Sequence, residues 1–168
     1  MNPRLMTTGV LVAGLGACAG IDVGPVTVTT LDSTGYAMCP WNGDEPSLLD
    51  VHERAGFEAL LSQAGLDVSR VAGWRPDFGR DHVVLVTAGP QPSAGYRVEW
   101  IDAALLGDRL RARVEIRPPP VGEMSATVMI SPCVIAWVRA PGAREVEVVD
   151  ARSGEAVAPP VLRPASRH

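Results

Sequence analysis

The sequence contains no lysine, so all 15 of its basic side chains are arginines. The net charge is only −4, and acidic and basic residues are interspersed rather than gathered in one segment. Proteins that bind nucleic acid or an anionic membrane surface usually carry a concentrated positive patch. We therefore expect neither a nucleic-acid interface nor a polybasic membrane contact, and the arginine bias favours a GC-rich genome over a functional explanation.

The sequence also lacks an apolar run long enough to cross a membrane. The uncharged stretch from Leu5 to Gly16 has about a dozen residues, whereas a membrane-spanning helix needs about 20. The stretch follows Arg4 and the amino terminus, which is the layout of a signal peptide. We therefore expect a cleaved leader over residues 1–17 rather than a retained transmembrane anchor.

The residues that follow this stretch, Leu15-Gly16-Ala17-Cys18, resemble the lipobox of bacterial lipoproteins. The resemblance implies cleavage before Cys18, acylation of that cysteine with chains such as palmitate, and a lipidated tether over residues 18–24. Several acyl chains make such an anchor durable. We expect a cell-envelope lipoprotein that faces the periplasm or the cell exterior. The alternative is an ordinary signal peptide in which Cys18 has no role.

Cysteine is scarce, with three residues in the chain. If Cys18 carries the lipid, Cys39 and Cys133 remain as a pair in an oxidising compartment, where disulfides form and persist. Two separate thiols are the alternative, because the sequence does not show whether the two Cα atoms come within bonding reach.

The pattern of apolar residues predicts an α+β domain over residues 25–162, dominated by antiparallel sheet. Phe57, Leu60 and Leu61 recur at helical spacing and predict one amphipathic helix over residues 53–64, packed on a single sheet face. Alternating or continuous apolar segments predict strands at residues 25–31, 48–51, 83–87, 96–101, 110–117, 125–130, 134–139, 145–149 and 156–161. We expect residues 163–168 to form a disordered tail.

Residues that commonly carry catalysis are few and do not form a recognisable motif. The nucleophile and base that the chain offers are a cysteine and a histidine, drawn from Cys39, Cys133, His52 and His82. We interpret the cysteines as a disulfide and the histidines as structural or exposed. We predict no catalytic residues, no cofactor and no metal site, because the fold contains two histidines and the sequence shows no close cluster of His, Asp and Glu.

Two other groups of residues have both a structural and a functional interpretation. Asp77 and Asp81 flank a short loop, where bonding to backbone N–H groups explains them at least as well as acid–base catalysis. The four tryptophans could line a ligand pocket, but a domain with so few aromatic residues usually needs them in its core. We expect Trp100 and Trp137 in the core, and weigh both roles equally for Trp41 and Trp74.

Four segments, taken in order, resemble the bacterial PrcB-like domain family, which is named for a lipoprotein subunit of a protease complex. They are Asp77-Phe78 before an apolar strand, the loop Gly89-Pro-Gln-Pro-Ser-Ala-Gly-Tyr96, the turn Pro118-Pro-Pro-Val-Gly122, and Ser131-Pro-Cys-Val134. The resemblance extends over about residues 48–149. The chain departs from the family at Ser93, Ala94 and Cys133, where threonine, glycine and tyrosine are usual.

The resemblance implies a non-catalytic subunit that binds and stabilises a partner protein, in particular a protease. The candidate contact is the loop of Pro92, Ser93, Ala94, Gly95 and Tyr96, since a proline-glycine loop is pre-organised and an aromatic ring adds contact area. Tyr96 could equally close the turn by packing. Two other functions stay open: a protease inhibitor that uses this loop as chagasin-like inhibitors do, and a hydrolase of unrecognised type.

Overall fold

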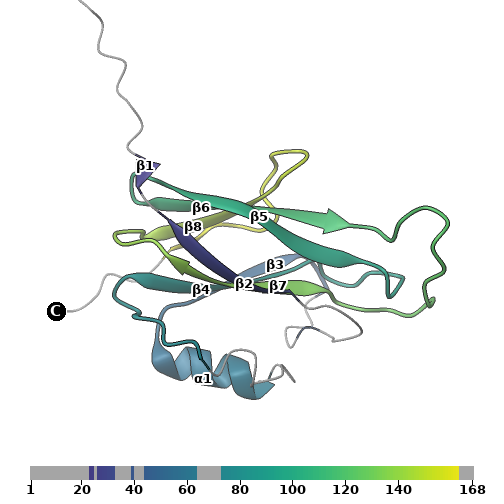
Figure 1. Cartoon of the computed structure of the whole chain (residues 1–168), viewed down its shortest axis with the longest axis horizontal. Helices are drawn as coiled ribbons and strands as arrows, with labels where there is room; N and C mark the ends of the chain where they lie inside the picture. Colours follow the sequence, from purple (N-terminus) through teal and green to yellow (C-terminus); the bar gives the residue numbers. More distant parts are fainter. Residues whose placement is uncertain (1–22, 25, 33–38, 40–43, 64–72, 163–168) are drawn as a thin grey trace, which may run out of the picture.

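The computed structural model describes residues 23–24, 26–32, 39, 44–63 and 73–162, which form two β-sheets packed face to face with a helix on one of them (Figure 1). The elements in chain order are β1 (Val23–Gly24), β2 (Thr27–Asp32), β3 (Ser47–Val51), α1 (Arg54–Gln63), β4 (Asp81–Thr87), β5 (Arg97–Leu106), β6 (Arg109–Arg117), β7 (Cys133–Arg139), β8 (Glu145–Asp150) and β9 (Val161–Leu162).

The two sheets differ in size and in the order of their strands. The larger has the order β1-β5-β6-β8-β9 and the smaller has the order β2-β7-β4-β3. Neighbouring strands of the described chain are antiparallel except for β6 and β8, which run parallel. The predicted α+β class, mostly antiparallel with one helix, is confirmed, and the division into two sheets is new.

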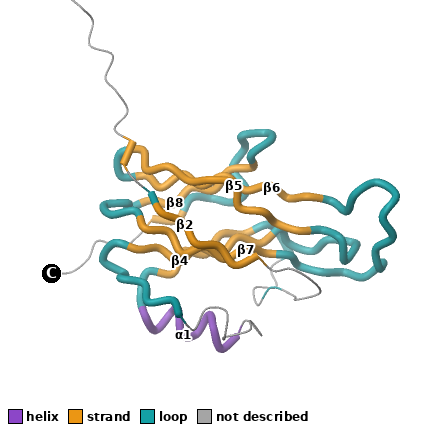
Figure 2. The backbone as a smooth tube through the Cα atoms, viewed as in Figure 1, coloured by secondary structure: helices purple, strands orange, loops and turns teal. Residues whose placement is uncertain are grey.

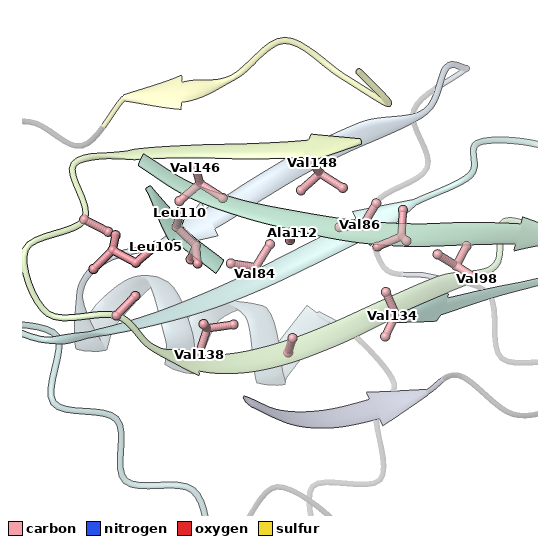
Figure 3. Packing of buried hydrophobic residues seen from close by; sticks show 14 of the residues in the cluster. Val84, Val86, Val98, Leu105, Leu110, Ala112, Val134, Val138, Val146 and Val148 are labelled. Carbon is pink, nitrogen blue, oxygen red and sulfur yellow. The ribbon is translucent and has the colours of Figure 1, made fainter. Parts of the chain in front are cut away.

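The main core lies between the two sheets. Alternate residues of β4, such as Val84 and Val86, point toward the larger sheet and meet Leu110, Ala112 and Val146 (Figure 3). All five side chains are fully buried. Burying a valine or leucine side chain stabilises a fold by about 1.5 to 3 kcal/mol. These contacts therefore hold the two sheets together as one body.

The helix covers the other face of the smaller sheet. Phe57 and Leu60 of α1 pack against Val83, Leu85 and Ile135, the outward-facing residues of β4 and β7. The smaller sheet thus has a helix on one face and the larger sheet on the other (Figure 1). Because both faces are covered, every residue of β4 is buried, which explains its continuous apolar run.

Strand β5 is longer than the sequence pattern predicted. The register with β6 shifts between Trp100 and Asp102, so Ile101 is an extra, unpaired residue that is 40% exposed. A bulge of this kind reverses which residues face inward. Val98 before it and Leu105 after it both enter the main core. The simple alternation therefore stops at Ile101, although the strand continues to Leu106.

Two predicted strands are wrong. Residues 125–129 form no strand, and Ile130 makes only an isolated bridge with Gln91, because the segment runs beyond the ends of both sheets. In the segment 156–161, Ala156 bridges Val149, and regular pairing resumes at β9. Two prolines, Pro159 and Pro160, interrupt this segment, and proline has no N–H to donate to a sheet.

Several expectations concern residues outside the described chain. They are the leader 1–17, most of the expected tether 18–24 and the tail 163–168. Val23 and Gly24, the last two residues of the expected tether, form β1 and pair with Leu106 and Leu105. Within the described residues, no helix has the length and apolar character needed to span a membrane.

Candidate protein-binding surface

The loop 89–96 and the segment 118–130 lie together at one end of the molecule, beyond β5 and β6 (Figure 2). Gln91 and Ile130 exchange two backbone hydrogen bonds, with N···O distances of 2.7 and 3.0 Å. The N–H of Ala94 donates to the carbonyl of Ala126 at 3.0 Å. These bonds fasten the two segments side by side, so we call them together the loop end.

Side chains add to this connection. The hydroxyl groups of Ser93 and Ser125 are 2.7 Å apart, and the N–H of Gly95 donates to the Ser93 hydroxyl at 3.3 Å. A Cβ atom added to Gly95 would lie 2.5 Å from the Cβ of Pro119. Only glycine therefore allows the loop to approach the proline-rich turn so closely.

The start of the loop also requires a glycine. Gly89 has φ of +68°, and a Cβ there would meet the backbone of Glu45 at 2.9 Å. Its N–H donates to the Thr87 hydroxyl at 3.1 Å, and the neighbouring Ala88 N–H donates to the carbonyl of Pro132 at 3.0 Å. Three of the four segments that carry the family resemblance are thus joined in one structure.

Comparison with known protein families bears on this arrangement directly. Residues 82–139 match the family model described as PrcB C-terminal. The matched segment starts at His82 and ends at Arg139, so it contains the loop end and the bend at Ser131-Pro132 but not Asp77-Phe78. The resemblance inferred from the sequence is confirmed over this range. No curated protein and no solved structure matches the chain.

The matched segment exposes apolar side chains that sequence reasoning missed. Val121 and Met124 are fully exposed, at 107% and 99%, while Val128 and Met129 are 46% and 59% exposed. Val121 lies in the proline-rich turn, and the other three residues follow it. We assigned Val128 and Met129 to a strand over residues 125–130, whose burial would have hidden some of these side chains.

The predicted contact residues fall on the same surface. Pro92 is exposed, and Ser93, Ala94, Gly95 and Tyr96 are half-buried. The Tyr96 N–H donates to the carbonyl of Ser93 at 3.3 Å, which closes the turn through the backbone. This backbone bond closes the turn without involving the ring of Tyr96.

The two cysteines, for which the sequence left a disulfide and two separate thiols both open, are joined in the structure. Cys39 and Cys133 are 94 positions apart in sequence, and their Cα atoms are 5.7 Å apart, a distance that suits a disulfide. The Cys39 N–H also donates to the carbonyl of Ser131 at 2.9 Å. The disulfide therefore ties the beginning of β7 to the earlier chain. Cys18 lies outside the described residues.

His82 and Cys133, one of the pairs that could have formed a catalytic dyad, are separated in the structure. His82 points into the main core side of β4, where its Nδ1 lies 3.1 Å from an Asp50 carboxylate oxygen, and both side chains are buried. Cys133 belongs to the cluster on the opposite face and pairs with the far end of β4. His52 is exposed.

The two aspartates of the 77–81 turn have structural partners. The Asp77 carboxylate accepts a bond from the Gly79 N–H at 3.1 Å, as the backbone-bonding interpretation predicted. Asp81 is fully buried and accepts bonds from the Asp77 N–H, from Trp137 Nε1 and from Arg139 Nε at 2.8, 2.9 and 3.0 Å. Burial favours the neutral acid, but these donors outweigh it and hold the pKa of Asp81 below its usual value.

The tryptophans have different surroundings. Trp74 is buried and its ring lies 6.0 Å from that of half-buried Trp137, within the cluster beneath α1. Trp137 also borders a hollow of about 120 Å³ with Thr27, Thr29 and Arg139, smaller than usual ligand pockets of about 300 Å³ or more. Trp100 packs against the main core, and Trp41 lies outside the described chain.

In the part of the chain that the structure describes, no three His, Cys, Asp or Glu side chains come close enough together to hold a metal ion.

Proposed function

We propose that the protein is an envelope lipoprotein whose domain binds and stabilises a partner protein without chemistry of its own. The family resemblance favours a secreted or surface protease as the partner. The observation that carries the proposal is the loop end, where two family-like segments are fastened together and leave apolar side chains exposed. Large exposed apolar side chains, gathered in one place, are typical of protein-binding sites.

A second large surface of the domain is much less suited to an apolar contact. The outer face of the larger sheet carries rows of paired charges, such as Arg109 with Glu145 at 2.9 Å and Arg111 with Glu147 at 3.4 Å. Arg113 pairs with Asp102 in the same way. Charged pairs of this kind are well solvated and contribute little to a binding interface unless they are buried. This contrast supports the loop end as the binding surface.

Anchoring through Cys18 can be tested by metabolic labelling with palmitate. The wild-type chain should incorporate label and fractionate with membranes. The Cys18→Ser variant should incorporate none and leave the membrane fraction. Label that persists in Cys18→Ser, or a wild-type chain that stays unlabelled, would contradict the lipoprotein part of the proposal.

The stabilising role can be tested by deleting the gene and measuring the envelope proteome. The level of one secreted or surface protein should fall several-fold and recover when the wild-type gene is restored. An unchanged proteome would contradict a stabilising role. If the purified domain instead inhibited papain-like enzymes tightly, the loop 92–96 would be an inhibitory wedge, and the inhibitor alternative would replace the proposal.

A further inference from the structure

The loop between β6 and β7 has a hydrogen-bonded turn at its tip. Gly122, with φ of +87°, allows a tight turn in which the Glu123 N–H donates to the carbonyl of Pro120 at 3.1 Å. Val121 lies within this turn, and Met124 follows it directly. Because the turn already holds the backbone, less backbone conformational entropy would be lost when a partner binds.

The position of the loop relative to the amino terminus is informative. β1 pairs with Leu105 and Leu106, beside the turn that starts β6, whereas the loop leaves the other end of β6 (Figure 1). Nine residues of β6 span about 30 Å. The residues between Cys18 and Val23 could extend over only about 17 Å. A lipid on Cys18 therefore could not reach the loop at the other end of β6.

The chemistry of the loop argues against a second membrane contact. Residues 118–130 contain no arginine, lysine, tryptophan, tyrosine or phenylalanine, and their one charged residue is Glu123. Segments that enter a membrane surface usually combine basic residues with aromatic anchors. Methionine, by contrast, is enriched in protein interfaces and adapts to irregular apolar recesses.

We propose that the tip of this loop, centred on Val121 and Met124, inserts into an apolar recess of a folded partner protein. This inference rests on the proposed function and names the surface that performs it. The exposed Pro92 and half-buried Tyr96 belong to the loop 89–96, which is fastened to the same segment, and would form the rim. A stable interface buries at least about 1,000 Å², so the tip acts as the anchor within a larger contact.

Photo-crosslinking of the full-length lipidated chain in its own envelope tests the inference. A benzophenone amino acid replaces Val121, Met124 or, as a control, Ile101, which is 40% exposed at the bulge of β5. We expect the same protein, identified by mass spectrometry, to be crosslinked from both loop positions and not from position 101. The double variant Val121→Ser with Met124→Ser should recover at least tenfold less of this protein, whereas Ile101→Ser should recover the wild-type amount.

The outcomes separate the two proposals. Adducts with lipid, or with a second copy of the chain, from the loop positions would overturn the inference. So would a partner that crosslinks only from position 101 or still binds the double serine variant, although the proposed function would then stand. If no protein were crosslinked from any of the three positions, both would be overturned. An unchanged urea midpoint for the double variant, expected because both side chains are exposed, shows that lost binding is not lost folding.

Discussion

Asp81 is the residue whose protonation is most directly connected to the fold. Its buried carboxylate joins the 77–81 turn to Trp137 and Arg139 on β7. We expect Asp81→Asn to lower the free energy of unfolding by about 2 kcal/mol at pH 7, the usual cost of disturbing a buried, hydrogen-bonded group. Urea denaturation monitored by tryptophan fluorescence measures this difference.

The pH dependence of that difference follows from the lowered pKa of Asp81. Because the folded-state pKa lies below the ordinary value of 3.8, the stabilisation is fully present above about pH 5 and is lost as the pH falls through the folded-state pKa. The difference in stability between wild type and Asp81→Asn should therefore shrink as the pH falls below this ordinary value. A matched control is Asp102→Asn, whose Arg113 pair is half exposed and should contribute less than about 1 kcal/mol. If the difference in the free energy of unfolding between wild type and Asp81→Asn did not change with pH, this account would be contradicted.

The buried pair of His82 and Asp50 predicts strong coupling between two residues. Removing one partner leaves the other buried without this hydrogen bond, which costs about 1 to 3 kcal/mol. We expect His82→Leu and Asp50→Leu each to be destabilising by such an amount. The double variant should lose less than the sum of the two, as a double-mutant cycle in urea would show. If the two losses in the free energy of unfolding were strictly additive, the side chains of His82 and Asp50 would not be energetically coupled.

At the scale of elements, the disulfide joins two parts of the chain that are far apart in sequence. Closing a loop of 94 residues stabilises a fold by up to about 4.7 kcal/mol on the chain-entropy account. Thiol titration of the unfolded Cys18→Ser chain should detect free thiols only after reduction, and reduction should lower its urea midpoint. Two reactive thiols before reduction would show that Cys39 and Cys133 are separate.

The contact between Gly95 and Pro119 predicts a steric effect that is confined to the loop end. Gly95→Ala would force the loop away from the proline-rich turn, at a cost of about 1 to 3 kcal/mol for overpacking. Gly73→Ala is the matched control, because nothing lies within 4 Å of its added Cβ, and it should leave stability nearly unchanged. Equal thermal midpoints for the two variants would contradict the close packing.

Most of the regular elements could be predicted from the sequence, but some could not. Helix α1 and the strands β3, β4, β6, β7 and β8 were predictable, because local apolar periodicity reports the buried face of each. The full length of β5 was not, since the bulge at Ile101 reverses the periodicity without a local signal. The segment 125–130 was misassigned because exposed apolar residues such as Met129 produce the same pattern as buried ones.

For the molecule as a whole, the candidate site was only partly predictable. The loop of residues 92–96 was identified by resemblance, but its attachment to the segment 118–130 depends on long-range contacts such as Ser93 with Ser125. The pairing of the strands into two sheets likewise depends on contacts between distant residues. In the proposed arrangement, the lipid lies at one end of the domain and the partner binds at the other.

The most direct test of this account is affinity purification of the tagged, lipidated chain from its own envelope under mild detergent, with quantification by mass spectrometry. We predict that one secreted or surface protein, of the protease class that the family suggests, is recovered in near-equimolar amount. The Val121→Ser, Met124→Ser variant should lose this protein and Ile101→Ser should retain it. Recovery of the chain alone, from wild-type cells in which it is fully lipidated, would contradict the claim that it is a partner-binding subunit.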